Sequence, residues 1–197
     1  FQELPLSATM LLWINVVTDG IPAVALSLDP SEDGILDYSP RVFQNEIVSR
    51  RHWIEMIFFG ILLTIGVLGI YIIDLPQGVF AAKGAAFSAV VVFELLNIFL
   101  IRSGYKTSFF SNLWLLGAVI VTLLLHFLVI YSPIAGIFGI GRIDLLDWVY
   151  ILAVGGIIWI LVKGLNERLN EILDKAQGKI LCWICLVGAH QSGLPKG

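Results

Sequence analysis

Polar side chains that could bind a cation lie inside an apolar stretch near the start of the chain. Asn15, Thr18 and Asp19 fall within the segment 6–28, where Asp19 is the only ionisable residue. A carboxylate at membrane depth costs at least ~2.5 kcal/mol on insertion scales, so such residues usually face a bundle interior and serve an ion or proton path. Spacings of three and four residues place the three side chains on one face of a helix. The pattern predicts an oxygen-rich site that suits a hard cation.

The backbone of the same stretch is predicted to be broken. Pro22 has no N–H to donate to the carbonyl of Thr18, and its ring pushes this carbonyl aside. Gly20 loosens the same turn, because glycine has little preference for the helical conformation. We therefore expect at least one main-chain carbonyl to join the side-chain oxygens of the site.

A second acid lies deep in another apolar stretch. Glu94 is at least seven residues from either end of the segment 84–101, and Asn97 follows one turn later on the same face. Alone, Glu94 fits either of two roles: a protonated carboxyl that hydrogen-bonds between helices, or an ion ligand. Because Asp19 supplies an acid from another span, the pattern favours a shared site in which two carboxylates neutralise a divalent cation.

The composition is that of an integral membrane protein. Hydrophobic residues make up 58% and charged residues 14% of the 197 positions, with a mean hydropathy of +0.90; a soluble domain carries about 25% charged residues. We predict an all-α, polytopic bundle of five transmembrane helices, each near the roughly 17–25 residues that cross a bilayer. The predicted spans are about 6–28, 53–73, 84–101, 113–132 and 146–162. They form one domain over 1–175, followed by a tail, 176–197, to which no role is assigned.

The basic residues are unevenly distributed between the spans. Ten of the twelve Lys and Arg lie in the segments 29–52, 102–112 and 163–197, which five spans place on one side of the membrane. The segments on the other side hold only Lys83 and Arg142. The positive-inside rule then predicts a cytoplasmic C-terminus and an exoplasmic or lumenal N-terminus.

Three further features have simpler interpretations. His126 in the fourth span is predicted to be neutral and hydrogen-bonded to a neighbouring helix, in preference to a proton relay. Gly155 and Gly156 are predicted to permit close helix packing. The pair Cys182 and Cys185 has the spacing of a redox or zinc half-site, but a lone C-x-x-C is a weak signal. We expect this end of the chain to be interfacial or disordered, after a helical extension of the last span over 163–175.

The polar cluster and two later phrases resemble P-type cation-transporting ATPases of the calcium-pump (sarcoplasmic/endoplasmic reticulum-like) type. Residues 11–23, LLWINVVTDGIPA, resemble the sixth transmembrane helix of that family, written LLWxNxxTDGxPA. Residues 92–97, VFELLN, resemble the eighth helix, and residues 125–131, LHFLVIY, match a phrase from the ninth. Order and spacing agree over about 1–170. The resemblance implies that the five spans are helices six to ten of a ten-helix pump.

Carried over to this chain, the resemblance implies ion-ligand roles for Asn15, Thr18, Asp19 and Glu94. The aspartate is expected to touch both ions of a two-site calcium pump. Asn15 argues against sodium/potassium-type pumps, which have aspartate there, and Thr18 argues against secretory-pathway and plasma-membrane types, which carry methionine. Glu94 favours a two-site pump. The implied transported ion is Ca²⁺, although relatives with similar motifs leave other cations open.

The sequence lacks the parts that hydrolyse ATP in this family. It contains no DKTGT phosphorylation motif, no nucleotide-binding or actuator domain and no fourth-helix PEGLP segment, and the fifth-helix ligands are absent too. No catalytic or cofactor-binding residue is therefore predicted, and ATP and Mg²⁺ would act in domains outside this sequence. The expected partners are the remaining helices and cytoplasmic domains of a parent pump and the lipid bilayer, not nucleic acid. By the resemblance the segment 29–52 is expected to abut the phosphorylation domain; its length alone fits an unstructured connector equally well.

Two other classes of protein fit part of the pattern. A secondary or proton-coupled cation transporter would use Asp19 and Glu94 as proton sites and would carry an internal repeat, but the Asn-x-x-Thr-Asp-Gly cluster occurs once. A non-transporting membrane scaffold subunit would use the same polar residues only to hold helices together. A broken helix that offers oxygens near mid-membrane is a recurring transporter device, which favours the pump.

Overall fold

The computed structural model describes residues 4–28, 50–104 and 112–191, and the side chains of 4–28, 52–102 and 112–169. The described residues form helices and turns, with no strand among them, which confirms the predicted all-α class. Most of the segment 29–52, which we expect to abut a phosphorylation domain, lies outside the described residues.

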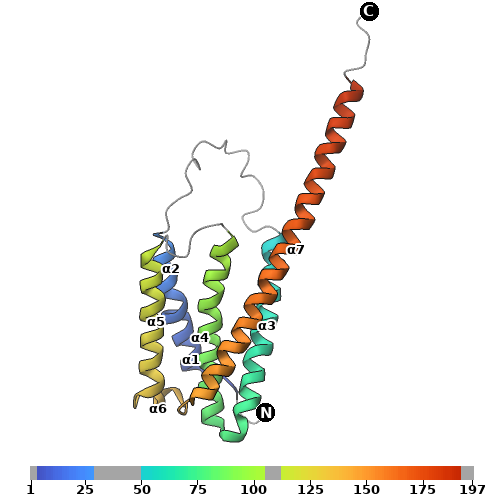
Figure 1. The fold of residues 1–197 in the computed structure, drawn as a ribbon. Helices are drawn as coiled ribbons and strands as arrows, with labels where there is room; N and C mark the ends of the chain where they lie inside the picture. Colours follow the sequence, from blue (N-terminus) through green and yellow to red (C-terminus); the bar gives the residue numbers. More distant parts are fainter. Residues whose placement is uncertain (1–3, 29–49, 105–111, 192–197) are drawn as a thin grey trace, which may run out of the picture.

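The helices run back and forth along the bundle (Figure 1). The first span consists of three pieces: α1, Ala8–Trp13; a π-helix, η1, Ile14–Asp19; and α2, Gly20–Leu26. The remaining elements are α3, Arg50–Asp74; a short 3₁₀ helix, η4, Leu75–Gln77; α4, Val79–Gly104; α5, Leu113–Tyr131; α6, Ala135–Phe138; and α7, Leu145–Gln191.

In the described part of the chain, five helical stretches are long and apolar enough to cross a membrane, as predicted. They cover Ala8–Leu26, His52–Gln77, Val79–Arg102, Leu113–Tyr131 and Leu145–Leu169. The third span begins before the predicted residue 84 and the fifth ends after the predicted residue 162. The extension of the third span contains Lys83, and that of the fifth span contains Lys163. A lysine near a helix end can carry its ammonium group to the interface, so a span can extend past such a residue.

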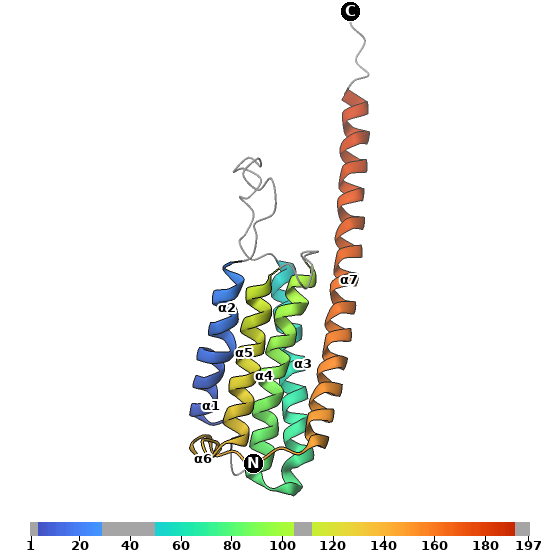
Figure 2. The same ribbon diagram turned by 60° about the vertical axis from the view of Figure 1, so that its left-hand side comes forward.

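The helix α4 lies at the centre of the bundle (Figure 2). It packs against α3 and α7 and also against η1 and α5, while α5 packs against α2. Small residues of α4 are completely buried, namely Ala82, Ala85, Ala86, Ser88 and Ala89. Small side chains let helices approach closely in a membrane, where van der Waals packing drives their association. The two halves of the bundle are therefore joined through α4.

One end of α4 is held by the segment that precedes α7. The N–H of Gly141 donates to the carbonyl of Phe80 at 2.7 Å. A Cβ built at Gly84 would lie 2.8 Å from the carbonyl oxygen of Gly141, closer than a real Cβ approaches a backbone atom. A glycine is therefore required at position 84 for this contact.

A second glycine brings α7 against α4. A Cβ at Gly155 would lie 2.9 Å from Cδ1 of Leu96 and 3.3 Å from Cε1 of Phe93, whereas a Cβ at Gly156 would meet nothing within 4 Å. The predicted packing role of the glycine pair is thus confirmed for Gly155 and is wrong for Gly156, which faces away from the other described residues.

The outward faces of the spans carry large apolar side chains. In α3, Ile57, Ile61 and Ile65 are all more than half exposed, and in α7 the same holds for Ile157 and Ile160. Contiguous apolar surface of this kind is rare on soluble monomers. It matches a bundle whose outer surface faces lipid.

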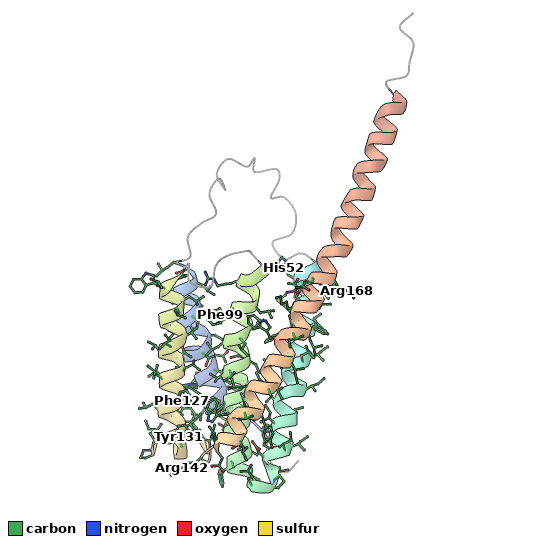
Figure 3. The ribbon with its side chains drawn as sticks, in the orientation of Figure 1. His52, Phe99, Phe127, Tyr131, Arg142 and Arg168 are labelled. Atoms are coloured by element: carbon green, nitrogen blue, oxygen red, sulfur yellow. The ribbon has the colours of Figure 1, made fainter. Side chains whose placement is uncertain are left out.

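The side chains labelled in Figure 3 show which helix ends meet at each end of the bundle. Phe127, Tyr131 and Arg142 lie toward the end where α5 finishes and α7 starts. His52 and Arg168 lie toward the other end, where α3 begins and α7 leaves the bundle. Figure 1 also shows that α1 begins at the first of these ends and that α7 finishes beyond the second.

The helix α7 continues beyond the bundle to Gln191 (Figure 1). The helical extension predicted over 163–175 is confirmed, but the expectation of a disordered end is wrong over 176–191, which are helical. No proline interrupts 145–191, so nothing in the backbone chemistry ends the helix earlier. The side chains of Cys182 and Cys185 lie outside the described residues.

Candidate cation site

The first span changes helix type at the predicted ligands. The main chain is π-helical over Ile14–Asp19, and α-helix resumes at Gly20. The predicted irregularity is present, as a π-helical turn directly before Pro22. Pro22 is the third residue of α2, which continues η1 without a gap, so its missing N–H leaves a carbonyl of the preceding turn without a helical donor. The helix is therefore widened in the turn before the proline.

The predicted ligands in the π-helix differ in burial. Asn15 and Asp19 are exposed, whereas Thr18 is completely buried. A π turn closes from i to i+5 and holds more residues than an α turn, so residues three positions apart are less well aligned than in an α-helix. The convergence of all three side chains on one face stays a prediction.

Two of these side chains have polar atoms available to a ligand. The side-chain nitrogen of Asn15 donates to the carbonyl of Leu11 at 2.9 Å, which leaves its amide oxygen as the atom that a cation could use. The hydroxyl of Thr18 is buried and has no hydrogen-bond partner. A buried hydroxyl without a partner is costly, which is why such groups are usually satisfied by a ligand or water.

The two acids come together across η1 and α4, which pack against each other. The carboxyl groups of Asp19 and Glu94 are close enough to interact electrostatically. Glu94 is half-buried, and its Oε2 is buried without a hydrogen-bond partner. Two carboxylates in one place repel each other unless a proton or a cation lies between them. The arrangement is thus suited to holding positive charge.

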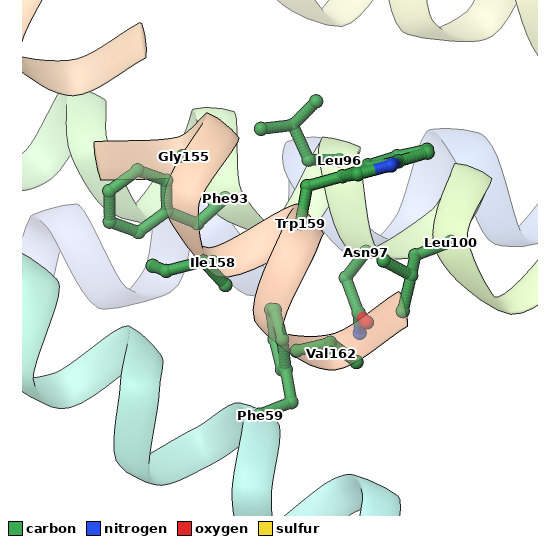
Figure 4. A pocket seen from close by; sticks show the side chains of 9 residues that line it. All are labelled: Phe59, Phe93, Leu96, Asn97, Leu100, Gly155, Ile158, Trp159 and Val162. Atoms are coloured by element: carbon green, nitrogen blue, oxygen red, sulfur yellow. The ribbon is translucent and has the colours of Figure 1, made fainter. Parts of the chain in front are cut away.

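Asn97, predicted to lie on the face of Glu94, is instead part of a small pocket between α3, α4 and α7. Figure 4 shows its side chain near Trp159 and Val162 of α7, in a pocket that Phe59 of α3 also lines. The lining of this pocket is otherwise apolar. Asn97 therefore lies where α3, α4 and α7 pack together.

The candidate site is incomplete within the described residues. Among them, no group of three or more His, Cys, Asp and Glu side chains could hold a metal ion. Ca²⁺ takes about 6–8 oxygen ligands. The side chains of Asn15, Thr18, Asp19 and Glu94 carry six oxygens between them, the lower limit of this range, so a complete Ca²⁺ site would need every one of them or further ligands from main-chain carbonyls or other helices.

The sequence did not reveal how Asn112 fixes the first span. Asn112 is almost completely buried, and its Oδ1 accepts from the N–H of Leu115 at 2.9 Å, which caps α5. Its Nδ2 donates to the carbonyl of Ala25 at 3.0 Å, so the end of α2 is tied to the start of α5. An asparagine before an apolar run is a recognisable helix cap, but the bond to a distant span has no local signal.

His126 has the hydrogen bond to a neighbouring helix that the sequence predicted. Its Nε2 lies 3.1 Å from Oγ of Ser88 on α4, and both side chains are completely buried. Because the hydroxyl of Ser88 donates to the carbonyl of Gly84 at 2.9 Å, Nε2 is assigned as the donor to Ser88. The ring of Phe87 packs edge-on against the imidazole at 4.8 Å. His126 therefore joins α5 to α4.

Comparison with known proteins identifies the class to which this fold and site belong. A family model described as "Cation transporting ATPase, C-terminus" matches residues 3–166. The chain belongs to this family, and with its five apolar helices it is an integral, multi-pass membrane protein. The resemblance predicted from the residues around Asp19 is thereby confirmed.

The relatives are larger proteins with a common description. A "Calcium-transporting ATPase" of Bacillus subtilis is 33% identical over 170 residues, which are 82% of this chain and 19% of the relative. "Calcium-transporting ATPase type 2C member 1" of Homo sapiens is 26% identical over 180 residues, 87% of this chain and 20% of the relative. "Calcium-transporting ATPase 1" of Yarrowia lipolytica is 24% identical over 166 residues, 81% of this chain and 18% of the relative. The chain spans about a fifth of the length of these relatives.

Proposed function

We propose that the chain is helices six to ten of an ATP-driven Ca²⁺ pump and that it supplies part of the intramembrane ion site. Asn15, Thr18, Asp19 and Glu94 are the proposed ligands. The observation that carries the proposal is the approach of the Asp19 and Glu94 carboxyl groups across η1 and α4. Divalent cations bind where carboxylates and neutral oxygens converge, so this pair gives the site its charge.

The π-helix supports the same function. π-helical turns are rare, and they occur frequently at functional sites. Here the turn covers Ile14–Asp19, the stretch that contains three of the four proposed ligands. Irregular backbone at membrane depth is tolerated where it is buried in protein or lines a cavity. The exposed face with Asn15 and Asp19 is therefore proposed to face further helices of the pump, which would complete the coordination.

ATP-driven transport is favoured over the other two classes. The relatives are named calcium-transporting ATPases, and the chain matches only their C-terminal region. ATP and Mg²⁺ are proposed to act in domains outside this sequence, and the ligands missing from the site are proposed to come from helices outside it. A secondary transporter would need no such domains, and a scaffold subunit would not need two acids close together in the membrane.

The proposed orientation places the C-terminus in the cytoplasm. The end of the bundle at which α3 begins and α7 leaves carries the flanking segments with ten of the twelve Lys and Arg. The other end, with η4 and α6, carries Lys83 and Arg142. This difference supports a cytoplasmic position for the first end and an exoplasmic or lumenal position for the second.

The experiment measures phosphorylation of the complete gene product by ATP as a function of Ca²⁺. In the Asp19→Asn variant we expect Ca²⁺-dependent phosphorylation to be lost, and in Glu94→Gln we expect it to require more Ca²⁺. Asp144→Asn is the matched control, because Asp144 is an exposed acid far along the chain from the site. Wild-type Ca²⁺ dependence in both test variants would mean that these acids only hold helices together.

A further inference from the structure

Two buried acids lie at the end of the bundle that contains η4 and the start of α7. Asp74 is the last residue of α3 and is 1% exposed, and Asp147 is in the first turn of α7 and is 2% exposed. They are the only acids among the buried residues of the described chain. Neither belongs to the proposed ion site, which Asp19 and Glu94 form elsewhere in the bundle.

One glutamine bridges the two carboxyl groups. The side-chain nitrogen of Gln77, in η4, lies 3.4 Å from Oδ1 of Asp74 and 3.4 Å from Oδ1 of Asp147, and it donates to both. The two carboxyl groups therefore share one donor, and the negative charge of Asp147 acts on Asp74. The remaining oxygen of Asp74, Oδ2, is buried and has no donor near it. A proton on Asp74 would give this oxygen a partner.

The helix ends decide which acid holds the proton. Asp147 accepts a hydrogen bond from the N–H of Asp144 at 2.7 Å, through its Oδ2, and it lies at the N-terminus of α7, where the helix dipole stabilises negative charge. Asp74 lies at the C-terminus of α3, where the dipole opposes negative charge. Since two buried carboxyl groups in contact do not both ionise, the proton belongs on Asp74.

The other titratable groups at this end come from the neighbouring elements. They are Lys83 on α4, Tyr131 at the end of α5, and Arg142 and Asp144 in the segment before α7. The hydroxyl of Tyr131 is bonded to the carbonyl of Ile143 and to the side chain of Trp148. Arg142 and Asp144 are exposed, and Lys83 is half-buried and has an interaction of its own. Of the charged groups at this end, Asp147 is the one whose negative charge acts on the carboxyl group of Asp74.

We propose that Asp74 and Asp147 form a proton-binding site, in which one shared proton holds the end of α3 to the start of α7. With the proton present, the hydroxyl of Asp74 donates to the carboxylate of Asp147 while Gln77 donates to both. Without it, two buried negative charges repel each other and the contact between α3 and α7 is weakened. The pair responds to the pH of the exoplasmic or lumenal side, given the membrane orientation proposed above.

The proton is detected directly by infrared spectroscopy of the complete gene product in lipid. A protonated carboxyl group has its own C=O stretching band, and we expect one such band to disappear on Asp74→Asn and to disappear from the wild type as the pH is raised. Asp144→Asn is the control and keeps the band, because only the backbone of Asp144 contacts Asp147. If the spectra of the wild type and Asp74→Asn are the same at every pH, the proposal is wrong.

Thermal stability provides the second readout. Folding keeps the proton that the unfolded chain gives up, so the pair stabilises the fold at low pH and this stabilisation is lost as the pH rises. We expect the melting temperature of the wild type to fall, relative to that of Asp74→Asn, as the pH is raised. The amide of asparagine replaces the proton, since it donates to Asp147 at every pH and its oxygen still accepts from Gln77. A difference that stays constant with pH overturns the proposal.

The asymmetry of the pair is tested by the reciprocal variant. Asp147→Asn places an amide where two donors, the N–H of Asp144 and the side chain of Gln77, require acceptors. We expect this variant to melt at a lower temperature than Asp74→Asn at all pH values, and the opposite order would contradict the assignment of the proton. None of these measurements involves Ca²⁺, so their outcome is independent of the proposed transport function.

Discussion

Two adjacent glycines of α7 allow a matched test of the packing that positions Glu94. Alanine is favoured over glycine in a helix by about 1 kcal/mol, and this gain is the same at Gly155 and Gly156. A Cβ at Gly156 meets nothing, so Gly156→Ala keeps the gain. A Cβ at Gly155 lies 2.9 Å from Leu96 and 3.3 Å from Phe93. The end of the Leu96 side chain and the ring of Phe93 must shift to admit this methyl group, so Gly155→Ala should be less stable than Gly156→Ala, by about 1 kcal/mol, the low end of the cost of overpacking.

The same contacts connect α7 to the ion site. Phe93 and Leu96 flank Glu94 on α4, so a larger residue at position 155 displaces the helix that carries the acid. We expect Gly155→Val to raise the Ca²⁺ concentration needed for phosphorylation, and Gly156→Val to leave it unchanged.

The assay compares the fraction of complete gene product that stays monodisperse in detergent after heating, together with Ca²⁺-dependent phosphorylation. Equal thermal stability of Gly155→Ala and Gly156→Ala would refute the close approach of α7 to α4. Equal Ca²⁺ dependence of the two valine variants would refute the inference that this contact positions Glu94.

Further predictions concern the buried polar contacts. Asn112→Ala should lower the melting temperature, because capping and the bond to α2 are both lost at a cost of about 1–2 kcal/mol. Ser88→Ala leaves His126 without its partner and should destabilise the protein by about 1–3 kcal/mol, measured by the same heating assay. Thr122→Val should be neutral or stabilising, since the buried hydroxyl of Thr122 has no partner to lose; a clear loss of stability there would show that this hydroxyl is satisfied.

The features that the sequence predicted are those with a local cause. The five spans follow from apolar runs of bilayer length, and Asp19 is conspicuous because no other charge lies in its span. The break near Pro22 was predicted in the right turn, but its form, a π-helix over Ile14–Asp19, was not predicted. The i, i+3 spacing that aligned Thr18 with Asn15 assumes α-helical turns, whereas this stretch is π-helical.

The features that the sequence did not reveal depend on contacts between distant residues. Asp74 and Asp147 are separated by more than seventy positions, and each alone looks like an ordinary charge at the end of a span. Asn112 and Ala25 are equally remote in sequence, and Ser88 is one of many small residues on α4. Only the contact of Ser88 with His126 involves α4, and the central position of this helix could not be inferred from its hydropathy alone.

Equilibrium Ca²⁺ binding to the complete gene product, measured with radioactive calcium, tests the central claim most directly. If Asp19 and Glu94 serve one site, Asp19→Asn should abolish saturable Ca²⁺ binding and Glu94→Gln should lose at least part of it. The double variant should bind no less Ca²⁺ than Asp19→Asn alone, because the effects of residues that act together are not additive. Wild-type stoichiometry and affinity in both single variants would contradict the account.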